Sequence, residues 1–492
     1  MVYSKFCGIV WAFSACLAVG INATRAAAPV RDSQGPRDVG SDWQLFVDDW
    51  LIDEMKNARL KLHSPVRREV VFRFDAPWEG NNSAYVTMLK DGEQYRMYYR
   101  GFGNTDREYT CVAFSDDGIH WTRPNLGLIE CKGSKDNNIF FTAEAKAFHE
   151  AHNFSPFIDR NPACRPDQRY KAVTCDVTLL PGETDDRKTL AAYVSADGIH
   201  FKPLRKEPII THGAFDSHNT AFWDVVQKQY VCYVRETKDG KKNVARCTSK
   251  DFVNWTKSEL LDYGPVPTEH FYTNGIFQYE RNPRLYIGLP MRFVHPRECK
   301  VIGFVPRETD GFSDAVFMSS HDGQHWHRCF MEAFIRPGLE PHNWGNAHIN
   351  QTPAWGILQT SPSELSIYWQ EDADGIPSLR RGTVRLDGFA SINAGYDGGE
   401  VVTKPLIFKG NRLVLNVSTS AVAHVLVEIQ DVDGKPIPGY TLAECPRIFG
   451  DELERPVGWK NGADVGSLAG KPVRLRFVLK DADVFAFRFE EL

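Results

Sequence analysis

The sequence predicts an all-β protein, a five-bladed β-propeller followed by a C-terminal β-sandwich. A short unit, S-x-D-G-x-x-W/F, recurs along the first four-fifths of the chain, and a second repeat runs in the same phase. After about residue 398 this signature gives way to alternating strands separated by glycine-containing turns. A chain of 492 residues is long enough for two domains. We therefore expect a propeller over residues 42–395 and a sandwich over residues 398–492.

The first repeat is a turn followed by an aromatic residue. Successive copies lie 54 to 80 residues apart, which suits a four-stranded blade with loops of variable length. Aspartate and glycine favour a tight turn between the two outer strands, and the aromatic side chain is expected to fill the gap between neighbouring sheets. The third copy is degenerate and the fifth is weak. The aspartates of the five copies are Asp117, Asp197, Asp251, Asp322 and Asp387.

The second repeat begins with an asparagine that opens a short apolar strand. A polar hairpin and a tyrosine-rich strand follow it. Two repeats in one phase indicate a propeller. We expect residues 43–53 to close the ring by completing the last blade, because closure removes free sheet edges. The asparagines are Asn82, Asn153, Asn219, Asn274 and, in the loosest copy, Asn350.

These repeats resemble the five-bladed propeller glycoside hydrolases of the β-fructosidase, arabinanase and mannoside-phosphorylase type, over roughly residues 42–395. The resemblance implies a carbohydrate-active enzyme with carboxylates near the start of the innermost strand in each of the first three blades. The fructosidase motifs W-M-N-D-P-N-G, R-D-P and E-C do not occur here in their family context. Residues 78–81, Trp-Glu-Gly-Asn, occupy the first place without the family's aspartate.

The N-terminus has the pattern of a secretory signal peptide. Lys5 precedes an apolar run over residues 6–21, and small residues cluster at 23–28. We expect residues 1–28 to be removed, the mature protein to be secreted or periplasmic, and no membrane span to remain. A net charge of −5 gives no indication of a nucleic-acid partner.

Acidic residues precede the innermost strands at matching positions. Glu79, Glu150 and Asp216 each lie three residues before the repeat asparagine, and Glu269 lies five before Asn274. Glycoside hydrolysis commonly uses one carboxyl group as acid and another as nucleophile or base. We predict Asp216 and Glu269 as the catalytic pair and Glu79 as a third candidate; capping and loop roles on a solvated rim are the alternative.

Histidine, asparagine and aromatic residues are expected at the same mouth. Six histidines at 149, 152, 218, 270, 342 and 348 suit hydroxyl binding, proton transfer or a divalent metal, although no H-E-x-x-H spacing occurs. No cofactor is predicted, and a divalent metal at this cluster stays open. Arg100, Arg235 and Arg292 would either reach a substrate carboxylate or sulfate or form salt bridges between blades. The predicted substrate-binding residues are His152, Asn153, His218, Asn219, His270, Tyr272, Asn274, Trp344 and His348.

The leading hypothesis is an exported glycoside hydrolase that degrades a poly- or oligosaccharide. A second hypothesis is a non-catalytic glycan-binding surface propeller, in keeping with the missing family motifs. A third is a metal-dependent polysaccharide lyase that uses a histidine or Tyr272 as base.

Overall fold

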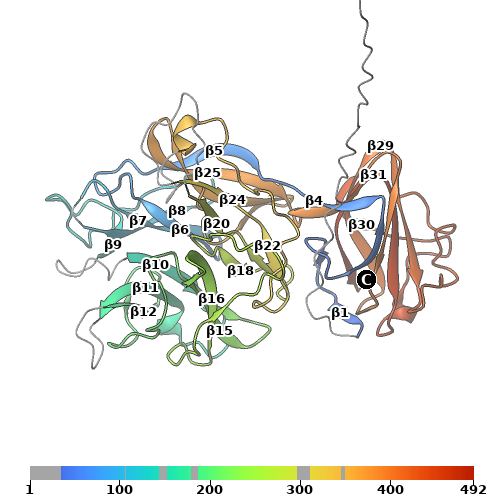
Figure 1. The fold of residues 1–492 in the computed structure, drawn as a ribbon, viewed down its shortest axis with the longest axis horizontal. Coiled ribbons are helices and arrows are strands. Elements are labelled where there is room, and N and C mark those ends of the chain that lie inside the picture. The colour runs from blue at the N-terminus through green and yellow to red at the C-terminus, as the bar shows by residue number, and fades with distance from the viewer. Residues whose placement is uncertain are drawn as a thin grey trace, which may run out of the picture.

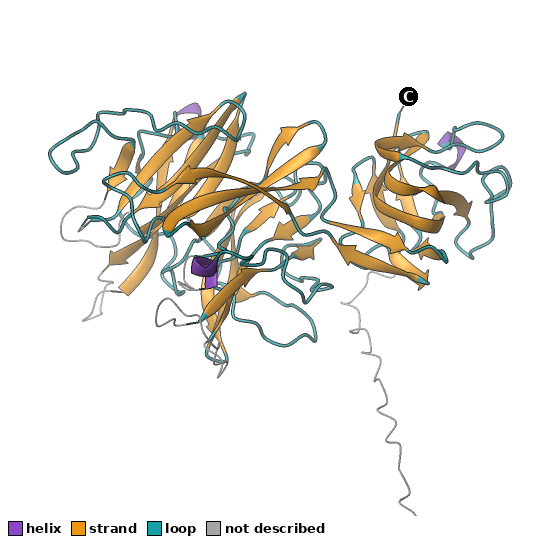
Figure 2. Cartoon of the chain, turned by 90° about the horizontal axis from the view of Figure 1, so that it is seen from above, coloured by secondary structure: helices purple, strands orange, loops and turns teal. Residues whose placement is uncertain are grey.

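The computed structural model describes residues 35–105, 107–142, 152–178, 187–295, 311–344 and 350–491. Two lobes lie side by side, a propeller and a smaller C-terminal β-unit (Figure 1). Strands build both lobes, and the described helices are short 3-10 turns (Figure 2): η1 (Pro166–Gln168), η2 (Pro341–Trp344) and η3 (Gly466–Leu468). Within the described ranges, the structure contains no helix with the length and apolarity needed to cross a bilayer.

The propeller consists of five antiparallel blades, as predicted. Innermost strands of neighbouring blades contact one another around the ring. Four blades have four strands each, ordered β6 (Ala84–Asp91), β7 (Gln94–Gly101), β8 (Tyr109–Ser115), β9 (Ile139–Thr142); β10 (His152–Ile158), β11 (Tyr170–Thr178), β12 (Arg187–Ser195), β13 (Lys202–Pro203); β14 (Thr220–Asp224), β15 (Gln229–Lys238), β16 (Lys241–Ser249), β17 (Glu259–Leu260); and β23 (Leu358–Ser361), β24 (Glu364–Ala373), β25 (Ile376–Arg385), β5 (Val66–Arg73).

Blade four departs from the four-stranded pattern. Its sheet contains β18 (Ile276–Gln278), β19 (Tyr286–Gly288) and β22 (Met318–Ser320), and β20 (Met291–Val294) pairs separately with β21 (Phe312–Ala315). A single bridge between Ser319 and His327 takes the place of the fourth strand.

The S-x-D-G-x-x-W/F unit forms the expected turn in four copies. One carboxylate oxygen of Asp117 accepts the backbone N–H groups of Ile119 and His120 at 2.7 and 2.8 Å, and the other three copies repeat this pattern. Gly198 has φ of +79°, and a Cβ there would lie 2.6 Å from the Tyr98 hydroxyl of the preceding blade. The glycine and the tyrosine-rich strand therefore meet at the junction between blades, which explains why both repeats share one phase.

The fifth copy has a different role. Asp387 is buried, accepts a hydrogen bond from the Tyr279 hydroxyl at 2.5 Å, and pairs with Arg281 at 3.0 Å. The chain then enters the C-terminal β-unit through β26 (Ala390–Ala394) instead of forming an outer blade strand.

Ring closure uses a different segment from the one we predicted. The strand β5 (Val66–Arg73) pairs with β25 and completes blade five. Residues 43–53 instead belong to the C-terminal β-unit, because β2 (Gln44–Leu45) pairs with β31 (Arg474–Glu490), and β3 (Ile52–Lys56) pairs with β27 (Gly399–Thr403). Closure was anticipated correctly, but the closing strand lies about 20 residues further along the chain.

The C-terminal β-unit combines N-terminal residues 37–62 with residues 390–490. Its eight-stranded sheet encloses an apolar core that includes Phe46 and Phe477. Long bent strands dominate this sheet, and a two-layer sandwich stays a prediction. Its remaining strands are β4 (Ala58–Leu62), β29 (Arg412–Gln430) and β30 (Asp451–Pro456), while β1 (Arg37–Gly40) pairs separately with β28 (Leu406–Phe408).

Candidate active site at the propeller mouth

Backbone strain collects where the innermost strands begin. Tyr85, Asn153 and Gln351 have φ of 55°, 59° and 59°, and Gly275 has 55° at the matching place in blade four. In β6 and β10 the register shifts at these points. Left-handed non-glycine residues cost roughly 1–3 kcal/mol each and cluster at functional sites. This end of the channel is therefore the place to look for chemistry.

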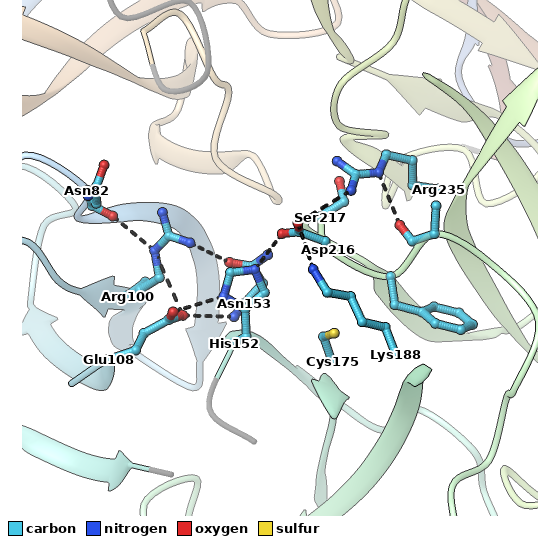
Figure 3. A network of polar contacts seen from close by, with 12 residues as sticks. Asn82, Arg100, Glu108, His152, Asn153, Cys175, Lys188, Asp216, Ser217 and Arg235 are labelled. Carbon is cyan, nitrogen blue, oxygen red and sulfur yellow. Dashed lines mark hydrogen bonds and ion pairs between the residues drawn. The ribbon is translucent and has the colours of Figure 1, made fainter. Parts of the chain in front are cut away.

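Asp216 lies at the centre of a polar network that joins blades one, two and three (Figure 3). Its side chain is 47% exposed, and its two oxygens accept His152 Nε2 at 2.7 Å and Lys188 Nζ at 2.9 Å. Arg235 Nη2 lies 4.0 Å away. The hydrogen bonds from His152 and Lys188 hold the pKa of Asp216 far below its usual range, although burial opposes this shift. Asp216 is therefore an ionised carboxylate that is open to solvent.

A second carboxylate holds the other side of the imidazole. Glu108, which is buried, accepts His152 Nδ1 at 2.8 Å. Burial disfavours a charged imidazole, but the hydrogen bonds to Asp216 and Glu108 outweigh it and raise the pKa of His152. The imidazolium thus fixes the orientation of Asp216 between two anions (Figure 3).

Cations surround this network. Arg100 donates to Asn153 Oδ1 at 3.0 Å and lies over the Tyr85 ring at 4.6 Å. The Lys242 ammonium lies 3.8 Å from the centroid of the Tyr272 ring, and Arg235 lies 5.4 Å from it. Burial, reinforced by Arg235, lowers the pKa of Lys242 to about 8, and burial raises the pKa of Tyr272.

Two buried donors at the mouth lack partners within the described part of the chain. They are Arg235 Nη1 and Asn153 Nδ2. Unpaired buried donors cost about 1–3 kcal/mol each, so a ligand that accepts from them would gain binding energy.

Glu269 and Glu79 are enclosed by arginines, away from this network's contacts. Glu269 accepts Arg292 at 2.7 Å and Arg328 at 2.7 Å. Glu79 is fully buried and accepts Arg123 at 2.8 Å and the Tyr99 hydroxyl at 2.6 Å. Arg292 accordingly forms a salt bridge, one of its two expected roles. These surroundings favour structural roles for both glutamates, and their catalytic roles stay predictions.

His218 is a buried neutral histidine behind the mouth. Its Nε2 lies 3.2 Å from Thr87 Oγ1, and its ring centroid lies 5.8 Å from that of Tyr85. Burial, with Arg100 nearby, lowers the pKa of His218 to about 3.

This histidine makes stability depend on pH. An unfolded histidine titrates near pH ~6.5. Below that pH the unfolded chain binds a proton that the folded chain refuses until about pH 3, so stability falls as the pH decreases through this window. We expect His218→Gln to reduce the loss of unfolding free energy between pH 7 and pH 4 by about 3 kcal/mol, measured by denaturant titration. The exposed His212→Gln is the control; an unchanged pH dependence in His218→Gln would contradict the assignment.

Other predicted binding residues have mixed placements. Asn219 and Asn274 are buried and bond backbone groups: the Asn274 amide donates to the carbonyl of His218 at 2.8 Å, which links blades three and four. His270 is buried beside Phe293, and burial lowers its pKa to about 4. Trp344 is half exposed, with Nε1 donating to the carbonyl of Gly338. His348, like His149 and Glu150, lies outside the described residues.

The sequence reasoning missed Glu108, Lys188 and Lys242. All three lie at or just before third strands of blades. In an antiparallel blade, the first and third strands start at the same end, where the second strand finishes. Reading the starts of third strands as well as innermost strands would have found them.

The opposite end of the channel has a different character. A cavity of about 250 Å³ there is lined by Phe157, Trp223 and Trp355 among others. It is better enclosed than the mouth but contains no carboxylate with an imidazole partner among its lining residues. We therefore place the chemistry at the Asp216 network.

No protein-family model and no curated protein sequence matches the chain. Solved structures similar to it include an N-acetylgalactosamine deacetylase from F. plautii in complex with blood group B trisaccharide, with TM-score 0.45, 11% identity and coverage of 67% of this chain and 96% of that one. The Bombyx mori β-fructofuranosidase gives TM-score 0.41, 8% identity and coverage of 86% and 95%. A fructofuranosidase from Schwanniomyces occidentalis, complexed with fructosylnystose, gives TM-score 0.38, 11% identity and coverage of 85% and 96%. The five-bladed assignment itself rests on this chain's own sheet order.

Proposed function

We propose that the protein is an exported carbohydrate-active enzyme, a glycoside hydrolase that cleaves an acidic poly- or oligosaccharide at the propeller mouth. The observation that carries this proposal is the half-exposed, ionised Asp216, held between His152 and Lys188 where three blades meet. The signal-like N-terminus supports export.

Asp216 is suited to act as nucleophile or base. Its lowered pKa keeps the carboxylate charged at neutral pH, and a negative charge stabilises an oxocarbenium-like transition state. Glu108 and His152 act as positioning residues. Glu150, predicted at the start of blade two, is the candidate proton donor.

The charge of the mouth supports an acidic substrate. Arg100, Lys188, Arg235 and Lys242 outnumber the two carboxylates of the network. Arg235 also has the unpaired donor noted above, and an arginine fork matches a carboxylate or sulfate in geometry. We assign recognition of the anionic group to Arg235 and Lys242.

Binding of such a substrate would depend on the protonation of Lys242. Its ammonium loses its charge as the pH rises through about 8, so we expect KM for an acidic glycan to rise about tenfold across that range. Lys242→Arg keeps the charge and should flatten the profile, whereas the matched Lys241→Arg should follow the wild type. Identical KM profiles in wild type and Lys242→Arg would contradict this role.

The decisive experiment is product analysis from a panel of uronic-acid, sulfated and neutral glycans. Release of saturated reducing ends from acidic glycans supports hydrolysis. Tyr272 packed against Lys242 and Arg235 favours a second candidate, a β-eliminating lyase that acts on uronic acids; its products would carry a conjugated double bond with ultraviolet absorbance. Binding to an acidic glycan without cleavage would instead support the glycan-binding hypothesis.

A further inference from the structure

A cluster of metal-binding side chains lies far from the mouth, at the seam between the propeller and the C-terminal β-unit. Asp49 comes from the segment that follows β2, whereas His327 and Cys329 come from blade four. One donor atom from each lies within 4.8 Å of the other two. It is the one such group of three that the described ranges contain.

The repeat makes these residues stand out. After the aromatic residue of the turn unit, blades one, two and three have Thr122 and Pro124, Lys202 and Leu204, and Thr256 and Ser258. Blade four has His327 and Cys329 at those places. Of the four turn copies that lead into an outer blade segment, the one that faces Asp49 is thus the one that offers an imidazole and a thiol.

The local backbone explains why both side chains face the same way. Alternate residues of an extended chain share one side. His327 is partly exposed and Cys329 exposed, while Arg328 between them is buried and bonds Glu269 on the other side. The His327 Nδ1 lies 3.1 Å from Asp49 Oδ1.

The opposing segment is held in place by its neighbours. Asp48 is buried and accepts the Ser319 hydroxyl at 2.6 Å and His321 at 3.2 Å. Trp50 stacks on the His321 ring with 4.2 Å between centroids. Asp49 is therefore presented to blade four by anchored residues on both sides.

We propose that Asp49, His327 and Cys329 bind a divalent transition metal, with Zn²⁺ the best match. Zinc takes carboxylate oxygen, imidazole nitrogen and thiolate at 2.0–2.3 Å, which places tetrahedral ligands about 3.3–3.8 Å apart. A shift of roughly 1 Å, within the reach of exposed side chains, converts the present cluster into that arrangement. The set leaves a fourth position for water and joins the two lobes.

The test uses purified, tag-free, reduced mature protein titrated with Co²⁺, which reports a thiolate ligand by a near-ultraviolet charge-transfer band. We expect one equivalent of Co²⁺ per chain, a band that Zn²⁺ abolishes by displacement, and a thermal midpoint that rises on Zn²⁺ addition. Cys329→Ser should lose the band, and the exposed Asp49→Asn should weaken Co²⁺ binding at least tenfold.

Cys164→Ser is the matched control, because Cys164 is a partly exposed thiol next to Lys171, outside the cluster. It should keep the band unchanged. Absence of a stoichiometric band in the wild type would overturn the proposal, as would a band that survives in Cys329→Ser.

Discussion

Asp216→Asn is expected to lower kcat for cleavage of the substrate by about 10²–10⁴-fold, the range typical of a removed acid–base or nucleophilic group. The substitution keeps the size of the side chain and its oxygen acceptor for His152 and Lys188, but removes the charge. Binding of glycan should persist, since Arg235 and Lys242 remain. Initial rates at saturating substrate, with far-ultraviolet circular dichroism to verify folding, measure the effect.

Asp197→Asn is the control for this experiment. Asp197 is also about half exposed and bonds a histidine, His200, at 2.7 Å, but it lies in an outer turn of blade two. It should retain full kcat. A folded Asp216→Asn variant with wild-type kcat would remove Asp216 from the chemistry.

Glu79→Gln is expected to destabilise the fold by about 3–5 kcal/mol, the usual cost of removing one partner from a buried ion pair. Glu79 has no exposed side-chain area and accepts bonds from Arg123, Tyr99 and the backbone N–H of Ala76. The amide would leave the Arg123 charge without its partner anion. Urea unfolding at pH 7 measures the difference.

An exposed glutamate–arginine pair provides the comparison. Glu69 is 46% exposed and lies 2.9 Å from Arg381, so Glu69→Gln should cost at most about 1 kcal/mol. If Glu79→Gln kept full stability and lost catalysis, Glu79 would return to the catalytic candidates.

The repeats predicted the blades because their information is local. The turn at Asp117 needs only the backbone N–H groups two and three residues on, and Gly198 needs only its positive φ and a tyrosine that the other repeat supplies. Asp216, His152 and Arg235 were likewise found by counting from the repeat asparagines.

Pairings between distant segments lay beyond such counting. The ring closes with β5 instead of residues 43–53, because strand choice depends on which hydrogen-bonding edge is nearest in space. Glu108 becomes part of the site only when β8 brings it to His152, and Arg292 and Arg328 enclose Glu269 only when blade four folds.

By itself, the sequence determined the all-β class, the five blades and the end of the ring where polar residues gather, since turns and strand phase are encoded within a few residues. Only the tertiary structure decided which acid is exposed and which are neutralised by arginine. That distinction depends on charges and burial contributed by segments tens to hundreds of residues apart.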